Sequence, residues 1–323
     1  MLIAIGVLLL FPLVGSSFYI GLLTRILIIA LFAMSLDLLI GYTGLISFGH
    51  AAFFGVGAYA FAIGFQNAVD IHLWQALPLS LVAAGLAALL IGWISIRTSG
   101  IYFVMITLAM AQMFFYYFFE SRRFGGDDGI FLFSKPVLMV GGSDLLQLDN
   151  ETRFYYFALF FLVLAYLVLR MILRAPFGKV IMAIKANEHR VRALGYATSR
   201  YKLVSFVIAG TLSGLAGFLE GAHSGYVNPS YLSWHESGVC IAIVVLGGMG
   251  TLYGPIIGAF IIVLLQNFLP EWTEHAQLVL GMIIIAVVLF LPHGISSLPT
   301  QLKKIQQQRV KLPDELTAEG VDG

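Results

Sequence analysis

Long uninterrupted blocks of apolar residues constrain this chain more than any other feature of its sequence. The blocks run for about 15–25 residues, the length that an α-helix needs to cross about 30 Å of hydrocarbon at about 1.5 Å per residue. Hydrophobic residues make up 59% of the 323 positions and charged residues only 11%, a balance far from that of soluble domains. Lipid admits only helices or closed barrels, and the alternating pattern of barrel strands is missing. The sequence therefore predicts an all-α, polytopic transmembrane helical bundle.

Ten apolar segments are expected, which allow eight to ten membrane crossings. They cover residues 2–14, 19–40, 46–65, 74–96, 101–119, 154–170, 203–220, 237–245, 254–269 and 278–291. The first and the eighth are short for a full crossing. The first basic residue is Arg25, so residues 2–14 lack the positive start of a cleaved signal peptide and are interpreted as a retained membrane segment.

The distribution of Lys and Arg predicts the orientation of the bundle, because cytoplasmic loops carry an excess of these residues. Residues 170–202 hold eight of the 18 basic residues, and the tail after residue 298 holds four. Residues 120–153 carry four basic and six acidic residues. We expect both termini and a loop at 171–202 in the cytoplasm, and an external loop at 120–153. A single transmembrane domain would cover residues 1–298, followed by a polar cytoplasmic tail at 299–323.

Glycines and polar side chains interrupt the apolar pattern at residues 37–66, which read DLLIGYTGLISFGHAAFFGVGAYAFAIGFQ. This chemistry suits an unwound or re-entrant segment, whose free N–H groups and helix N-terminus can face a polar solute. A tight turn between two closely packed helices is the alternative. The candidate translocation-pathway residues are Asp37, Gly41, Thr43, Gly44, Ser47, Gly49 and His50.

Three ionisable residues in these apolar blocks need an explanation. Asp37 could face a cavity or partner, as intramembrane acids usually do, or it could hydrogen-bond a neighbouring helix or cap the break near Gly41. His50 could contact solute or serve as a packed, hydrogen-bonded side chain. Glu220 lies at the outer end of its segment and is expected to reach water.

Small residues four positions apart let helices approach closely in lipid, where no hydrophobic force drives them together. The expected packing residues are Gly210, Gly214, Gly254 and Gly258. Gly41-Tyr-Thr-Gly44 and Gly247-Gly-Met-Gly250 form a short internal echo. Whether this echo marks an internal repeat stays open.

The cytoplasmic stretch at 174–202, RAPFGKVIMAIKANEHRVRALGYATSRYK, predicts two short amphipathic helices. Pro176 ends one helix or begins the next, Asn187 is a good N-cap for the second short helix, and Gly195 is placed to end it. The expected apolar faces contain Val180, Ile181 and Ile184 in the first helix, and Val191 and Leu194 in the second. Such a surface could dock a soluble partner or lie on anionic lipid.

Motifs for catalysis and cofactor binding are missing. The chain has no G-x-x-x-x-G-K-[ST], so it is not expected to bind or hydrolyse ATP. It has no H-E-x-x-H, G-x-S-x-G or Cys–His cluster, and its single cysteine, Cys240, excludes an intrachain disulfide. We expect no enzymatic activity, no cofactor, no metal site and no nucleic-acid partner.

Three stretches in chain order resemble the permeases of high-affinity branched-chain amino-acid ABC importers, most of all the longer, M-type permease. They are GYTGLISFGHAAFFGVGAYA (41–60), AIKANEHRVRALG (183–195) and VLGGMGTLYGPIIGA (245–259). The resemblance covers residues 23–291. It implies a pathway for Leu, Ile and Val formed with a homologous second permease in the bacterial cytoplasmic (inner) membrane. Two cytoplasmic ATPase subunits and a periplasmic or lipid-anchored binding protein would complete the importer.

Carried onto this chain, the resemblance makes residues 188–195 the region that inserts into an ATPase cleft and places residues 41–57 along the pathway. The coupling candidates are Lys179, Lys185, Asn187, Glu188, Arg190, Arg192, Leu194 and Gly195. Related permeases for urea, amides or other amino acids share the pattern, so the solute stays open. A stand-alone secondary transporter or channel is the alternative from another class.

Overall fold

The computed structural model describes residues 8–9, 11–13, 16–65, 72–132, 136–140, 143–147, 150–290 and 294–295. Most of the first expected segment (2–14) and the whole polar tail (299–323) therefore lie outside the described residues. Within residues 2–14, a short 3-10 turn spans Phe11–Leu13.

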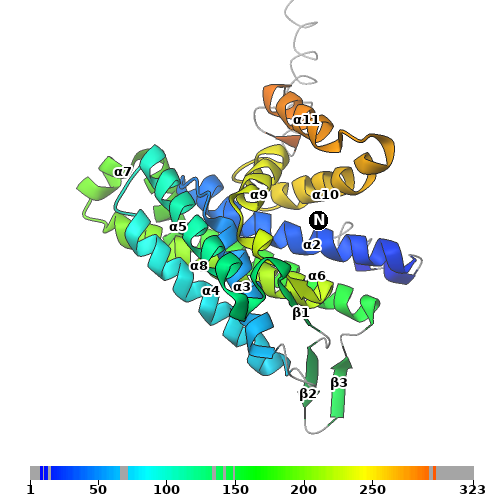
Figure 1. The fold of residues 1–323 in the computed structure, drawn as a ribbon. Coiled ribbons are helices and arrows are strands. Elements are labelled where there is room, and N and C mark those ends of the chain that lie inside the picture. The colour runs from blue at the N-terminus through cyan, green and yellow to red at the C-terminus, as the bar shows by residue number, and fades with distance from the viewer. Residues whose placement is uncertain are drawn as a thin grey trace, which may run out of the picture.

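Helices make up most of the described chain (Figure 1). Six are long and apolar enough to cross a membrane: α2 (Ser17–Asp37) with its π-helical end Leu38–Thr43, α4 (Leu73–Ser95), α5 (Ile101–Glu120), α6 (Glu151–Arg174), α8 (Thr198–Ser224) and α10 (Gly254–Trp272). Three shorter apolar helices are α3 (His50–Phe65), α9 (Trp234–Gly247) and α11 (Ala276–Phe290). These helices correspond in order to the second through tenth expected segments. The protein is a helical, polytopic membrane protein.

Short strands are present that the apolar blocks do not predict. β1 (Ile130–Phe131) pairs antiparallel with β4 (Tyr226–Val227), and β2 (Val137–Val140) pairs antiparallel with β3 (Ser143–Gln147). Pairing satisfies backbone groups of the connecting segments outside the helices. The β2–β3 hairpin and the amphipathic helix α7 (Pro176–Ala193) lie at opposite ends of the molecule (Figure 1).

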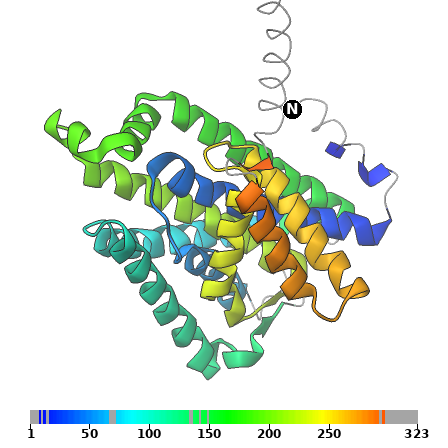
Figure 2. The same ribbon diagram turned by 90° about the horizontal axis from the view of Figure 1, so that it is seen from above.

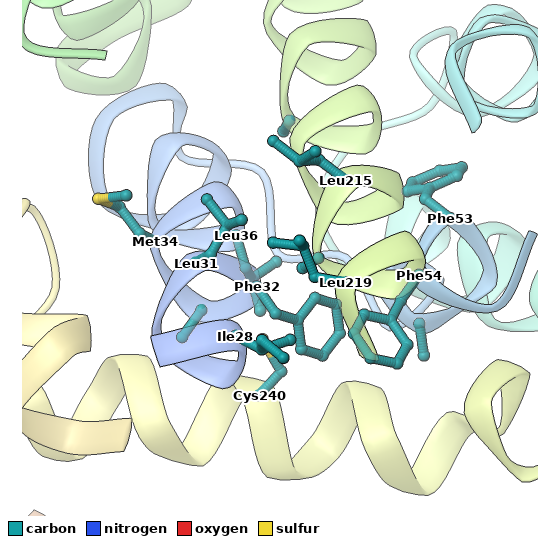
Figure 3. Close-up of a cluster of buried hydrophobic side chains, with 14 of the residues drawn as sticks. Ile28, Leu31, Phe32, Met34, Leu36, Phe53, Phe54, Leu215, Leu219 and Cys240 are labelled. Atoms are coloured by element: carbon teal, nitrogen blue, oxygen red, sulfur yellow. The ribbon is translucent and has the colours of Figure 1, made fainter. Parts of the chain in front are cut away.

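The centre of the bundle is formed by α2, α3 and α8, with α9 against them. Figure 3 shows apolar side chains of these helices packed together, among them Ile28, Leu31, Phe32, Phe54, Leu215, Leu219 and Cys240. The rings of Phe32 and Phe54 are 4.7 Å apart between centroids. Around this centre, α10 and α11 lie side by side along one edge and α4 and α5 lie on another side (Figures 1 and 2).

Glycines allow the helices to approach closely. Gly210 and Gly214 of α8 face Ala88 and Ala84 of α4, and a Cβ at either position would overlap the alanine methyl group. Gly258 of α10 lies against the backbone of α9 in the same way. Gly254 begins α10 and packs against the loop that follows α9. Van der Waals packing of this kind is a main source of helix association in lipid.

Glu220 does not reach water, contrary to the expectation from sequence. The helix α8 continues for another turn to Ser224, and the side chain of Glu220 is only 7% exposed. Its Oε2 atom is buried without a hydrogen-bond partner. This carboxyl group therefore belongs to the interior, where α8 lies beside α2.

Candidate translocation and coupling site

Helix α2 ends in a π-helical turn at the first glycine motif. The widened turn spans Leu38–Thr43, and single π-turns of this type are frequent at functional sites. The Oγ1 atom of Thr43 donates a hydrogen bond to the carbonyl oxygen of Leu38 at 2.9 Å. Gly44 then ends the turn with φ +78°, a conformation that favours glycine. Residues 44–49 are non-helical and α3 begins only at His50, later than the predicted start at residue 46.

The two glycine motifs of the internal echo meet in space. The backbone N–H of Gly250 donates a hydrogen bond to Oδ1 of Asp37 at 2.8 Å. A Cβ on Gly41 would lie 2.5 Å from the nitrogen of Gly250, so the two backbones come together where only glycine fits. Asp37 thus bonds to the loop between α9 and α10, whereas the interpretations from sequence were a cavity or partner, a neighbouring helix or a cap near Gly41.

Lys185 connects α7 to the same place. Its Nζ atom donates a hydrogen bond to the carbonyl oxygen of Gly41 at 2.5 Å. Its aliphatic Cγ would lie 3.1 Å from a Cβ at Gly44. We call the set Asp37, Gly41, Gly44, Lys185 and Gly250 the glycine junction. An amphipathic helix outside the bundle is therefore in direct contact with the break between α2 and α3.

The N-terminus of α3 is buried and already hydrogen-bonded. The N–H of Ala51 donates to Oγ of Ser237 on α9 at 2.9 Å. The Nε2 atom of His50 lies 2.8 Å from Oγ of Ser35, and its ring stacks on Phe32 with 5.5 Å between centroids. In this conformation His50 is a packed side chain that is fully buried.

The structure gathers the pathway candidates around the break between α2 and α3. Gly44 is exposed; the others, which are buried, are Asp37, Gly41, Thr43, Ser47, Gly49 and His50. Ser47 accepts a hydrogen bond from the N–H of Gly49 at 3.2 Å. A Cβ at Gly49 would lie 2.5 Å from the carbonyl oxygen of Thr107, so this segment also packs on α5.

Two short helices make up α7, as predicted. The backbone is non-helical at Asn187, and Oδ1 of Asn187 accepts a hydrogen bond from the N–H of Arg190 at 3.1 Å, which is the N-cap contact. The second helix ends at Gly195 with φ +88°. Its N–H donates to Arg192 at 3.0 Å and the N–H of Tyr196 to Val191 at 3.4 Å, the bonding pattern of a Schellman motif.

Glu188 ties the second short helix to the start of α8. Its Oε1 atom accepts hydrogen bonds from Arg192 and Thr198, each at 3.0 Å, and Oε2 accepts one from Nζ of Lys202 at 2.5 Å. Partial burial alone would raise the pKa of Glu188. The hydrogen bond and charge of Lys202, helped by Thr198 and Arg192, outweigh burial and lower that pKa below its ordinary value.

The inner and outer faces of α7 differ. Ile181, Ile184 and Val191 are buried and Val180 is partly buried, as the apolar pattern predicts. Leu194 is 76% exposed and does not share that apolar face, because it is the C-cap residue and lies beyond the last helical turn. We call the exposed side chains of α7 and its cap the coupling surface; they include Lys179, Arg190, Arg192 and Leu194.

Thr198 and Lys202 contact Glu188, and sequence reasoning did not single them out. Both begin α8 and both are buried. The sequence marks Lys202 only as one of the basic residues of 170–202. Its spacing from Glu188 gives no local signal, since the two residues are brought together by the loop between α7 and α8. Among the described residues, no group of three or more His, Cys, Asp and Glu side chains is suited to hold a metal ion.

The comparisons with known proteins agree with this architecture. The family model described as branched-chain amino acid transport system / permease component matches residues 18–288, from the first turn of α2 to the last turn of α11. The chain belongs to this family. No solved structure gives a significant match.

Curated relatives of this permease family include both types of subunit. The chain is 28% identical to the high-affinity branched-chain amino acid transport system permease protein LivM of Escherichia coli, over 93% of this chain and 75% of the relative. It is 24% identical to the corresponding LivH protein of Escherichia coli, over 84% of this chain and 91% of the relative. The autoinducer 2 import system permease protein LsrC of Klebsiella pneumoniae is 31% identical over 36% of each chain. The chain is an M-type permease by this measure, since similarity to LivM is higher and covers more of it.

Proposed function

We propose that this chain is the M-type permease subunit of an ABC importer that carries branched-chain amino acids across the bacterial cytoplasmic (inner) membrane. The observation that carries the proposal is the similarity to LivM over 93% of the chain, which includes the glycine junction and α7. Leu, Ile and Val are the proposed solutes. The chain itself is proposed to be non-catalytic, because it lacks a nucleotide-binding motif.

The proposed orientation places α7 in the cytoplasm. The basic segment 170–202 contains α7, and the loop 120–153, richer in acids, contains the β2–β3 hairpin at the opposite end of the molecule (Figure 1). Lys185 brings the end of α2 to the side of α7. Gly294, just after α11, packs closely on Gly248 of the loop that meets Gly41, so Gly294 lies on the same side. With residues 2–14 as a further crossing, both termini would be cytoplasmic and the crossings would number about ten.

The coupling surface is the proposed docking site for the ATPase subunits. It is basic and capped at both ends of its second helix, and Glu188 fixes its position relative to α8. A rigid, exposed element of this kind can transmit a push from a soluble partner, whereas a flexible loop cannot. Two ATPase subunits are proposed, one on this chain and one on the second permease.

The glycine junction is the proposed link from that surface to the pathway. A displacement of α7 would act through Lys185 on Gly41, and through Asp37 on the loop at Gly250. Residues 41–57 would therefore border the pathway and change position when ATPases close. The glycines of this buried region are the residues that would let its backbone segments move apart. They have no side chains that would need to repack when the backbones separate.

Partner subunits are proposed to cover much of the remaining apolar surface. Large side chains on the outer faces of the bundle are exposed, including Tyr102 and Met113 of α5 and Leu289 of α11. A homologous second permease and lipid would bury these faces. A periplasmic or lipid-anchored binding protein would deliver solute at the end that carries β1 and β4.

The experiment that tests the proposal is purification of the affinity-tagged chain from its native membrane in mild detergent, followed by reconstitution into proteoliposomes. We expect a second permease and two ATPase subunits to co-purify, and ATP-dependent uptake of leucine when binding protein is added. A chain that purifies alone and transports without ATP would be a secondary transporter or channel and would overturn the proposal. Uptake of urea or amides in place of leucine would overturn the assigned solute.

A further inference from the structure

Arg25 is a cation inside the span of α2 that no part of the coupling or junction uses. It is the first Lys or Arg of the chain, and the next is Arg97. It lies about 12 Å along the helix from Ser17, at about 1.5 Å per residue. Its neighbours Thr24 and Ile26 are buried, whereas Arg25 is exposed. Charged side chains at this depth face a partner or a water-filled space, because exposure to lipid is costly.

Two carboxyl groups share the electrostatic field of Arg25. Glu220 of α8 and Glu236 in the first turn of α9 both interact electrostatically with it. Within the part of the chain that the structure describes, the ion pairs shorter than 4.0 Å are both formed by Glu188. Arg25 therefore lies near two acids without closing a contact ion pair with either. The three side chains come from α2, α8 and α9, and α2 packs against both of the other helices.

Glu220 in particular has unused bonding capacity. It is more than nine-tenths buried, and its Oε2 atom accepts no hydrogen bond within the described chain. A buried carboxylate oxygen without a donor is unfavourable, since it has lost water and gained nothing. A ligand ammonium group would supply the missing donors, and an ammonium carries three of them.

The surface of α2 one turn before Arg25 is open. Gly21 lies one turn before Arg25 on the same face of α2, and a Cβ there would meet no atom within 4 Å. Tyr231 also interacts electrostatically with Arg25 and with both acids, and its ring lies 5.6 Å from that of Phe54 between centroids. The constellation thus combines a cation, two acids, a phenol and room next to them.

We infer that Arg25, Glu220 and Glu236 form a binding site for the zwitterionic backbone of an amino acid. This inference rests on the proposed function and adds the residues that would recognise the substrate class. The guanidinium fork of Arg25 matches a carboxylate in two parallel hydrogen bonds, and Glu220, with Glu236 beside it, accepts from the ammonium. Urea and simple amides carry neither charge and would leave both acids and Arg25 without partners.

A cysteine-protection experiment tests the site directly. Gly21→Cys is introduced with Cys240→Ala into the reconstituted complex, since Cys240 is the only native cysteine of this chain and is buried. The rate of labelling with a methanethiosulfonate ethyltrimethylammonium reagent is then followed on this chain by mass spectrometry. We expect leucine to slow labelling about tenfold, whereas isocaproic acid, which lacks the ammonium, and isopentylamine, which lacks the carboxylate, have little effect. No slowing by leucine, or equal slowing by the two analogues, would overturn the inference.

Charge-removing variants provide the second measurement. Arg25→Met and Glu220→Gln should each abolish protection of Gly21→Cys and lower leucine uptake about tenfold, while loaded binding protein still stimulates ATP hydrolysis. Arg153→Met and Glu120→Gln, exposed at the ends of α6 and α5, are the matched controls. If Arg25→Met fails to assemble, Arg25→Lys keeps the positive charge and should show weakened protection. If the wild-type complex transports leucine and both site variants take it up at rates within twofold of the wild-type rate, the zwitterion site is excluded. The importer proposal would then stay intact. A wild-type complex that does not transport leucine would instead overturn the proposed function.

Discussion

The Nζ atom of Lys185 donates a hydrogen bond to the carbonyl oxygen of Gly41, and the two residues are 144 positions apart in the chain. The bond joins α7 to the π-helical end of α2. Gly41 also lies against Gly250, whose N–H is held by Asp37. A movement of the amphipathic helix would therefore reach both glycine motifs through one side chain.

Lys185→Met should uncouple ATP hydrolysis from transport. The variant keeps the aliphatic contact with Gly44 but loses a charged hydrogen bond, which contributes about 1.5–3 kcal/mol. We expect leucine uptake by the reconstituted importer to fall about tenfold while ATP hydrolysis continues. Lys185→Arg retains a cationic donor and should recover part of the uptake. Normal uptake by Lys185→Met would remove this bond from the transmission path.

Asp37→Ala should lower leucine uptake and thermal stability more than Asp37→Asn does. The carboxylate Oδ1 accepts the hydrogen bond of the Gly250 N–H, and an amide oxygen can accept it in the same way. We expect Asp37→Asn to transport at a rate near wild type and Asp37→Ala to lose uptake and thermal stability together. If Asp37→Asn is as inactive as Asp37→Ala, the negative charge matters beyond its contact with Gly250.

Glu188→Lys and Arg190→Glu should each abolish uptake without preventing membrane insertion. Lysine at position 188 would repel Lys202 and break three hydrogen bonds, two of which, from Thr198 and Lys202, hold the coupling surface on α8. Glutamate at position 190 would reverse a charge on the exposed face offered to the ATPases. Uptake and co-purification of the ATPase subunits are the measurements. Normal transport by either variant would show that the coupling assignment is wrong.

Gly44→Leu should block transport without preventing assembly of the complex. Gly44 has φ +78°, which costs other residues about 1–2 kcal/mol, and its Cβ would press on Lys185. The strain falls on the junction and not on the helix contacts that hold the bundle together. Co-purification with the other subunits checks assembly, and uptake checks transport. Unimpaired uptake would exclude this segment from the pathway.

Gly217→Ala and Gly281→Ala form a matched pair that tests packing. A Cβ at Gly217 of α8 would overlap the carbonyl oxygen of Phe54, whereas one at Gly281 of α11 would meet no atom within 4 Å. We expect Gly217→Ala to destabilise the folded chain by about 1–3 kcal/mol, as overpacking does. Thermal unfolding in detergent, followed by size-exclusion chromatography, measures the difference. Equal stability of the two variants would contradict the close approach of α3 and α8.

Most of the helices could be predicted from the sequence, because a membrane-spanning helix is specified locally by its own apolar length. The segment expected at 101–119 is α5 (Ile101–Glu120), and that at 74–96 is α4 (Leu73–Ser95). The caps of α7 were also predictable, since Asn187 and Gly195 act on backbone groups within a few residues of themselves.

The break after α2 was visible in the sequence as a run of glycines and polar residues, but its form was not. The break begins with the π-turn at Leu38–Thr43. The late start of α3 at His50 depends on Ser237 of α9, whose Oγ accepts a hydrogen bond from the N–H of Ala51. Glu220 was wrongly expected to reach water and Leu194 was wrongly expected on the apolar face of α7, both for the same reason. Each follows from what the rest of the fold places around the residue.

The sequence by itself determined that this chain is a helical membrane protein, where most of its helices lie and which residues cap α7, since these properties depend on apolar length and local hydrogen bonding. Only the tertiary structure decided that Asp37 meets Gly250, that Lys185 meets Gly41 and that Arg25 shares its surroundings with Glu220 and Glu236. The members of each pair lie on different elements, far apart in sequence. Their contacts are set by how helices pack in three dimensions, which no local pattern of residues encodes.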